Sequence, residues 1–217
     1  MKLKLAIAAA LLASSVQAHA TLIIDNTTTG LYNAGLGDLA SMDGAGGFLL
    51  GANSSEGDPT IALASDPGFA FTSEFGTDWL AGDYTGGTWG APGSAIPGNW
   101  TVNTETAIVY DFFLDSLSNL TIDVGVDNGV VLWLDGAFLF GATRSGGANL
   151  NEYDINLSGI SAGDHLLQIL RSDHGGGTGF AIEVNSEATQ VPEPATLGLI
   201  GLGLVGMAVT RRRKQAA

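Results

Sequence analysis

The chain has 217 residues, 32 of them glycine and none cysteine, and its formal net charge is −14. The absence of cysteine excludes disulfides, thiolate nucleophiles and cysteine-ligated zinc, and the strong negative charge argues against nucleic acid as a partner. The basic residues lie mostly near the two ends, so residues 21–190 hold 21 carboxylates against two arginines, a net charge of −19.

Residues 1–20 have the three parts of a secretory signal peptide. Two lysines give the charged start, residues 5–16 are apolar apart from two serines, and Ala18-His19-Ala20 offers the small residues that signal peptidase accepts. The pattern predicts export, with cleavage before Thr21. A retained membrane anchor is the alternative, and it fits less well because the apolar run is short and a cleavage site follows it.

Residues 21–190 form the predicted globular body, where apolar residues occur in short segments between turn residues and without helical spacing. This pattern predicts an all-β domain. The clearest strand is 120–126, in which apolar residues alternate with polar residues or glycine. The other predicted strands are 21–24, 48–50, 61–63, 69–72, 107–114, 130–134, 137–140, 153–157, 165–170 and 180–184.

Turn signals connect several of these strands. Asp127-Asn128-Gly129 is predicted as a turn, and Asp135-Gly136 as the two-residue turn of a hairpin. A second hairpin is expected between residues 165–170 and 180–184, through the glycine-rich loop between them. Short strands with turns every eight to twelve residues indicate a β-sandwich of jelly-roll type, large enough for one core.

Two parts of the body, residues 25–47 and 73–106, are rich in glycine and small polar residues and are predicted as long surface loops. The runs VDNGVVLWLDG at 126–136 and AGDHL at 162–166 resemble β-sandwich domains of the PA14 and galactose-binding-like kind. This resemblance implies the same fold class as the strand pattern.

Catalytic residues are hard to assemble in the body. It has two histidines: His165 begins an apolar strand, a structural position, and His174 lies in an exposed glycine-rich loop. No serine stands in a Gly-x-Ser-x-Gly elbow, and no phosphate-binding loop with a lysine occurs. Any chain with 22 acidic residues contains pairs of carboxylates, so their presence does not distinguish a glycoside hydrolase from a protein without catalytic activity. The sequence therefore predicts that the protein is not an enzyme.

Calcium is the metal that the sequence fits best, since it prefers oxygen ligands from Asp, Asn and turn carbonyls. The candidate ligands cluster along one predicted hairpin, and they are Asp123, Asp127, Asn128 and Asp135. A body of charge −19 also gains from divalent counter-ions. The spacing is not that of an EF-hand loop, and hairpin turns without an ion explain the same residues.

Carbohydrate binding would need flat aromatic faces beside hydrogen-bonding groups. Four aromatic residues lie in the polar stretch 78–101 and are the candidates for such a platform: Trp79, Tyr84, Trp89 and Trp100. Aromatic residues on loops can stack on ligands, whereas those in strands usually fill the core. Ordinary packing in the core or the loops is the alternative.

After two prolines, residues 195–210 form a 16-residue run without a charge, followed at once by Arg211, Arg212, Arg213 and Lys214. A helix over this run would span about 24 Å, slightly less than the hydrocarbon core of a bilayer. Local thinning and snorkelling of the arginines allow it to cross. The basic tail, residues 211–217, would stay cytoplasmic by the positive-inside rule, which leaves the acidic body outside.

The order of Val191, Pro192, Glu193 and Pro194, then a glycine-rich apolar helix, then a basic cluster, resembles the PEP-CTERM sorting signal. Such tails occur in exported proteins of Gram-negative bacteria that make exopolysaccharide, and some descriptions label them the C-terminal domain of ice-binding proteins. The resemblance implies that an exosortase, a membrane cysteine protease-transpeptidase, recognises residues 191–194. An ordinary tail-anchor helix is the alternative.

These observations predict an exported, surface-sorted, non-catalytic protein of the envelope or exopolysaccharide matrix. Its partners would be signal peptidase, an exosortase, the membrane through the C-terminal helix, and exopolysaccharide. Its body would be structural or carbohydrate-binding, and an extracellular polysaccharide hydrolase is the alternative. Ice binding would need a flat, regular threonine face, and the sequence has no Thr-x-Thr ladder.

Overall fold

The computed structural model of the protein describes residues 20–39, 61–62, 66, 72–76, 78–144, 147–173 and 175–189. Residues 1–19 of the predicted signal peptide, the sorting motif, the C-terminal helix and the basic tail lie outside these residues, as do His174 and the strand predicted at 48–50. Within the described part of the chain, no helix is long and apolar enough to cross a membrane.

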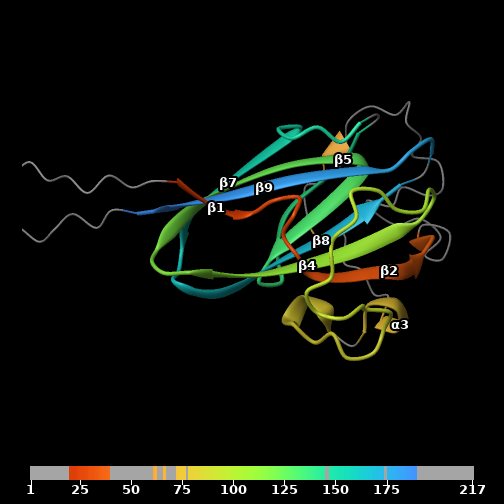
Figure 1. Ribbon diagram of the computed structural model, residues 1–217, viewed down its shortest axis with the longest axis horizontal. Helices are drawn as coiled ribbons and strands as arrows, with labels where there is room; N and C mark the ends of the chain where they lie inside the picture. The colour runs from red at the N-terminus through yellow and green to blue at the C-terminus, as the bar shows by residue number, and fades with distance from the viewer. Residues whose placement is uncertain are drawn as a thin grey trace, which may run out of the picture. The chain divides into compact units, whose positions relative to one another are not determined.

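Two antiparallel sheets share one long strand, β5 (Ser118–Leu134) (Figure 1). The first half of β5 lies in a sheet of order β1–β9–β5–β7, called the β9 sheet below. The second half lies in a sheet of order β2–β4–β8–β5–β6–β3, called the β8 sheet. The other strands are β1 (Ala20–Ile24), β2 (Leu31–Gly37), β3 (Ile61–Ala62), β4 (Glu105–Leu114), β6 (Ala137–Arg144), β7 (Tyr153–Ile160), β8 (Gly163–Ser172) and β9 (Gly179–Ala188).

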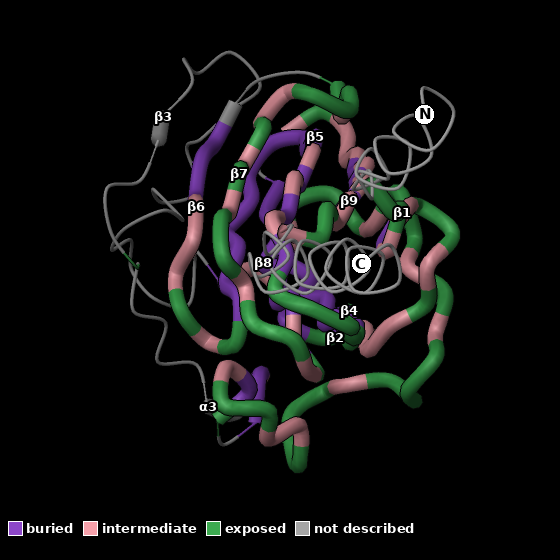
Figure 2. The backbone as a smooth tube through the Cα atoms, turned by 90° about the vertical axis from the view of Figure 1, so that its left-hand side faces the viewer, coloured by how far each residue is buried: buried purple, intermediate pink, exposed green. Residues whose placement is uncertain are grey.

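The main hydrophobic core lies between the two sheets. Even-numbered side chains of β5 enter it along the strand, from Leu120 to Leu134, because alternate residues of a strand point to the same face. Burial concentrates on β4, β5 and β8, whereas β7 alternates between partly buried and exposed residues (Figure 2). The predicted all-β sandwich is confirmed.

A second core covers the outer face of the β8 sheet. The short helix α3 (Thr72–Phe75) and the 3-10 helix η1 (Trp79–Ala81) pack there against Val131, Trp133 and Leu170. The second half of β5 is therefore buried on both faces, which explains its unbroken apolar sequence. Residues 73–106, predicted as a surface loop, thus contain part of this core, and Thr72, predicted to end a strand, begins α3.

The turn predicted at Asp127-Asn128-Gly129 is wrong, because β5 continues through it. Asp127 pairs with Gly179 of β9, and Gly129 pairs with Ser172 of β8, so the strand passes here from one sheet to the other. Partners in both sheets keep these residues in the strand and override their turn preference.

The hairpin predicted between β8 and β9 is also wrong. β8 pairs with β4 and β5, whereas β9 pairs with β1 and β5, so the two strands belong to different sheets. Strand β2 lies within residues 25–47, which were predicted as a loop, because β4 supplies a partner for its glycine-rich sequence.

The two-residue turn between β5 and β6 is confirmed. Asp135 and Gly136 have φ values of 51° and 76°, as a type I′ hairpin turn requires. Gly136 also passes close to η1, since a Cβ atom there would lie 2.6 Å from the Leu80 carbonyl oxygen. This turn therefore supports the 3-10 helix that covers the β8 sheet.

Candidate functional site

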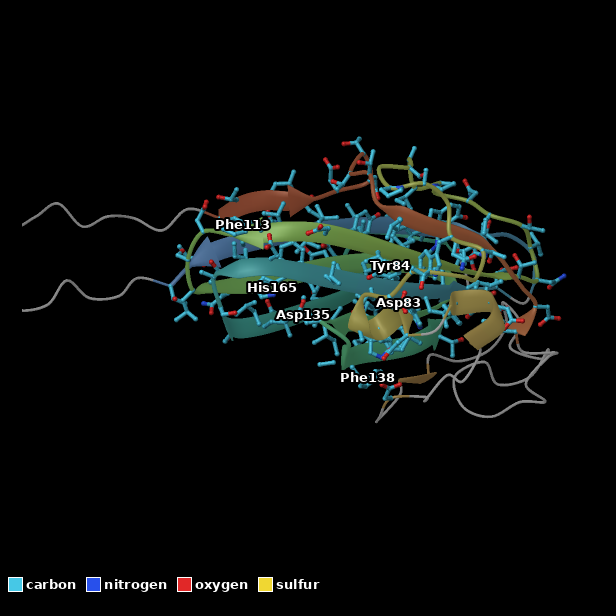
Figure 3. The ribbon with its side chains drawn as sticks, turned by 90° about the horizontal axis from the view of Figure 1, so that it is seen from below. Asp83, Tyr84, Phe113, Asp135, Phe138 and His165 are labelled. Atoms are coloured by element: carbon cyan, nitrogen blue, oxygen red, sulfur yellow. The ribbon has the colours of Figure 1, made fainter. Side chains whose placement is uncertain are left out.

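An open pocket of about 440 Å³ lies on the outer face of the β8 sheet, next to η1. Three aspartates from three different elements converge on it: Asp111 of β4, Asp164 of β8 and Asp135 of the β5–β6 turn. Its other lining residues are Leu80, Ala81, His165 and Leu166. We call it the acidic pocket, and Figure 3 shows its residues Asp135 and His165.

The register between β4 and β8 brings two of these carboxylates together. Asp111 lies opposite Leu166, and Phe113 lies opposite Asp164. Because residues two apart share a face, Asp111 and Phe113 both point outward from the sheet, beyond the part that α3 and η1 cover. Phe113 is 58% exposed, and its partner across the strands, Asp164, lines the pocket.

The β5–β6 turn is fastened to β8 through Asp135. Its backbone N–H donates to the Leu166 carbonyl over 2.9 Å, and its Oδ1 accepts from the Leu166 N–H over 2.8 Å. The other carboxylate oxygen, Oδ2, lies 2.7 Å from Nδ1 of His165. Asp135 therefore links the β5–β6 turn to both Leu166 and His165 of β8.

His165 has an acceptor at each ring nitrogen. Nε2 lies 2.9 Å from the Ser161 carbonyl oxygen, which can only accept, and Nδ1 faces the Asp135 carboxylate. Burial lowers the pKa of His165, but the hydrogen bonds to Asp135 and Ser161 outweigh it, so the pKa is raised. The geometry favours an imidazolium that partly offsets the three carboxylates.

Three of the four predicted aromatic residues come together, but as part of the second core. The ring of Trp79 lies 5.7 Å from that of Trp89, and Trp89 lies 5.2 Å from Tyr84. Trp79 also stacks on Phe75 at 4.8 Å and is only 5% exposed. The indole N–H of Trp89 donates to the Phe75 carbonyl over 2.6 Å. These rings hold α3 and η1 on the sheet, and Tyr84 and Trp89 remain partly exposed.

Trp100, the fourth aromatic residue, lies apart from the other three and packs against Arg171. The guanidinium carbon of Arg171 lies 4.4 Å from the Trp100 ring centroid and 4.8 Å from that of Phe180. Arg171 is fully buried and donates to Thr106 Oγ1, the Pro97 carbonyl and the Tyr32 hydroxyl. Burial lowers its pKa to about 10. Arg171 thus ties residues 97–106 to the sandwich.

The structure does not gather the four candidate calcium ligands. Asp123 is on the outer face of the β9 sheet, opposite Asp154 and Glu183, where burial and then these two neighbours raise its pKa. Asp127 and Asn128 are buried where β5 passes between the sheets, and Asp135 lines the acidic pocket. Among the described residues, no three histidine or acidic side chains are placed to hold a metal ion.

Two residues of the acidic pocket, Asp111 and Asp164, were missed as site residues by the sequence analysis. Asp111 carried a usable signal, because it interrupts the otherwise apolar strand 107–114 with a charge. Asp164 stood at the start of a strand, where an acidic residue is unremarkable. Their proximity depends on the pairing of β4 with β8, which single-chain patterns do not specify.

Comparison with solved structures finds three similar chains among others. A PA14 sugar-binding domain from an RTX adhesin is 17% identical, with 83% of this chain and 77% of that one covered and a TM-score of 0.33. The carbohydrate-binding module CBM36, in complex with calcium and xylotriose, is 14% identical, with 39% and 79% covered and a TM-score of 0.25.

The third similar structure is a Paenibacillus sp. cycloisomaltooligosaccharide glucanotransferase, 16% identical with a TM-score of 0.26. The match covers 45% of this chain and spans only 14% of the glucanotransferase. No curated protein matches the sequence. Residues 190–214 match the family model described as the PEP-CTERM protein-sorting motif, so the chain carries the sorting signal that its sequence predicted.

Proposed function

We propose that the protein is an exported, non-catalytic component of the envelope or exopolysaccharide matrix, and that its body binds carbohydrate through the acidic pocket. The PEP-CTERM motif supports export and recognition by an exosortase. The observation that carries the binding role is the pocket itself, which is lined by three carboxylates and by the aliphatic side chains of Leu80 and Leu166.

This combination suits a sugar because a sugar ring has hydroxyl groups at its edge and C–H groups on its faces. The carboxylates of Asp111, Asp135 and Asp164 accept hydrogen bonds from hydroxyl groups, and such charge-assisted bonds are the stronger ones. The volume of about 440 Å³ falls within the range of small-ligand pockets. No lysine or arginine is among the lining residues, so neutral sugars fit better than anionic ones.

Binding is tested with the purified full-length chain on an array of bacterial polysaccharides. We expect Asp111→Asn with Asp164→Asn to weaken binding at least tenfold, since each charged hydrogen bond contributes about 1.5–3 kcal/mol. The matched control is Asp154→Asn with Glu187→Gln, which removes the same charge from exposed positions of the β9 sheet. Equal binding by both double variants would refute the assignment of the pocket.

The same carboxylates would serve a polysaccharide hydrolase, the second function that the pocket permits. Release of reducing sugar from the bound polysaccharide, abolished by Asp111→Asn or Asp164→Asn, would replace the binding role by catalysis. Sorting is tested separately with Pro192→Ala and Glu193→Ala together. This variant should remain full-length in the membrane, and unchanged processing would contradict recognition at residues 191–194.

A further inference from the structure

The three most exposed large apolar side chains of the described residues lie toward one end of the body, two of them in or next to the turn between β4 and β5. Phe113 is 58% exposed, Leu22 is 51% exposed and Leu117 is 45% exposed. The other two such side chains, Val102 and Leu150, are less exposed, at 39% and 37%. They precede the first residues of β4 and β7 and so lie toward the opposite end.

Phe113 and Leu117 lie at the end at which β9 finishes. Leu22 lies near the same end but on the other face of the sandwich, because its partner Asn185 is on the outer face of the β9 sheet whereas Phe113 is on the outer face of the β8 sheet. Ser118, the residue after Leu117, is paired with Ala188, the last residue of β9. Ala20 at the start of β1 is paired with Glu187, and Leu22 is paired with Asn185. The turn between β4 and β5 completes this end, which we call the β4–β5 end (Figure 1).

The chain leaves the β4–β5 end directly into the sorting signal. Thr189 alone separates Ala188 from the matched motif at 190–214. The predicted membrane helix begins at residue 195, and seven residues span at most about 25 Å even when fully extended. If this helix anchors the protein, the β4–β5 end therefore stays within about 25 Å of the bilayer surface.

We propose that the β4–β5 end docks on the bilayer while the protein is anchored, with Phe113 and Leu117 entering the lipid interface. This inference rests on the anchored sorting signal of the proposed function. Exposed apolar side chains at one end match the shallow insertion by which proteins bind the headgroup region. Removal of the sorting signal would release the body from this surface.

The charged residues at this end indicate which lipid headgroups it can approach. Asp115 and Glu187 are exposed there, and so is Asp164, which lies opposite Phe113. The only arginine side chain that the structure describes, Arg171, is fully buried. Anionic lipids would be repelled, whereas the ammonium group of phosphatidylethanolamine offers these carboxylates a partner. The partner surface is therefore a zwitterionic bilayer.

The absence of native cysteine allows a clean labelling experiment on the full-length chain, reconstituted into phosphatidylcholine–phosphatidylethanolamine vesicles. Ser116→Cys places a fluorophore at the β4–β5 end, and Val102→Cys places the matched control label at the opposite end. Quenching by spin-labelled lipid headgroups should be strong at position 116 and weak at position 102. Adding phosphatidylglycerol should reduce quenching at 116, and salt should restore it.

Replacing the two exposed apolar side chains tests whether they cause the quenching. In a background of Phe113→Ser with Leu117→Ser, quenching at position 116 should fall to that at position 102. Both side chains are exposed, so far-UV circular dichroism should be unchanged, and Leu117→Ser alone gives a milder variant. Vesicle flotation of each variant reports the anchor independently of docking.

Three results would overturn the inference or its basis. Flotation with equal quenching at positions 116 and 102 would leave the anchor intact and refute docking. Loss of flotation in the unmodified chain would instead refute the membrane anchor. Label–label self-quenching at position 116 that rises with protein density, without quenching by lipid, would show that a second copy of the chain covers this end.

Discussion

Replacing Trp79 by alanine separates a structural role from a ligand-binding role for the predicted aromatic platform. Trp79 is 5% exposed and packs against Phe75, Trp89 and Trp133. A tryptophan buries about 200 Å² of surface, which at about 25 cal/mol per Å² amounts to ~5 kcal/mol. Measured losses for Trp→Ala in protein cores are about 3–5 kcal/mol.

We therefore expect Trp79→Ala to lower the free energy of unfolding by about 4 kcal/mol and the Tm by roughly 8–16 °C for a domain of this size. Urea unfolding followed by far-UV circular dichroism measures it without relying on tryptophan fluorescence. The control is Phe113→Ala, which alters an exposed ring and should change stability by less than about 0.5 kcal/mol.

Carbohydrate binding by the folded fraction of Trp79→Ala should be close to that of the unmodified chain, because the acidic pocket does not include this ring. A stability loss below about 1 kcal/mol would refute the assignment of Trp79 to the second core. Loss of carbohydrate binding together with unchanged stability would show that Trp79 stacks on the ligand, as the sequence allows.

Three further substitutions test the pH dependence, packing and hydrogen bonding of the body. Burial lowers the pKa of His165, but its hydrogen bonds raise it overall above the unfolded value near 6.5. The stabilisation by His165 is therefore complete below the unfolded pKa and is lost as pH rises through the folded pKa. In His165→Gln, the free energy of unfolding should change less with pH over this range than in the unmodified chain. Gly125→Ala would place a Cβ atom 2.1 Å from the Asn149 carbonyl oxygen, and it should cost about 1–3 kcal/mol in urea unfolding. A normal midpoint would show that residue 149 moves aside without cost. Arg171→Lys keeps the charge but not the guanidinium fork that reaches three acceptors, and thermal unfolding should show a loss of about 2–3 kcal/mol. Unchanged thermal stability would mean that this fork is dispensable.

Features that depend on neighbouring residues were predicted well from the sequence. The alternation in residues 120–126, the Asp135-Gly136 turn and the sorting signal at 190–214 are all local patterns, and each is confirmed. The unequal distribution of charge along the chain can also be read from the sequence, because it depends only on the positions of the acidic and basic residues.

Features that depend on partners distant in sequence required the tertiary structure. Asp127 and Asn128 have strong turn preference, yet Asp127 pairs with β9 and Asn128 pairs with β6 where β5 passes between the sheets. The acidic pocket exists because the pairing of β4 with β8 and the fold of the β5–β6 turn bring Asp111, Asp164 and Asp135 to one face. Local sequence determines which residues are able to form a strand or a turn, whereas long-range pairing and burial decide which of them do so and which side chains meet.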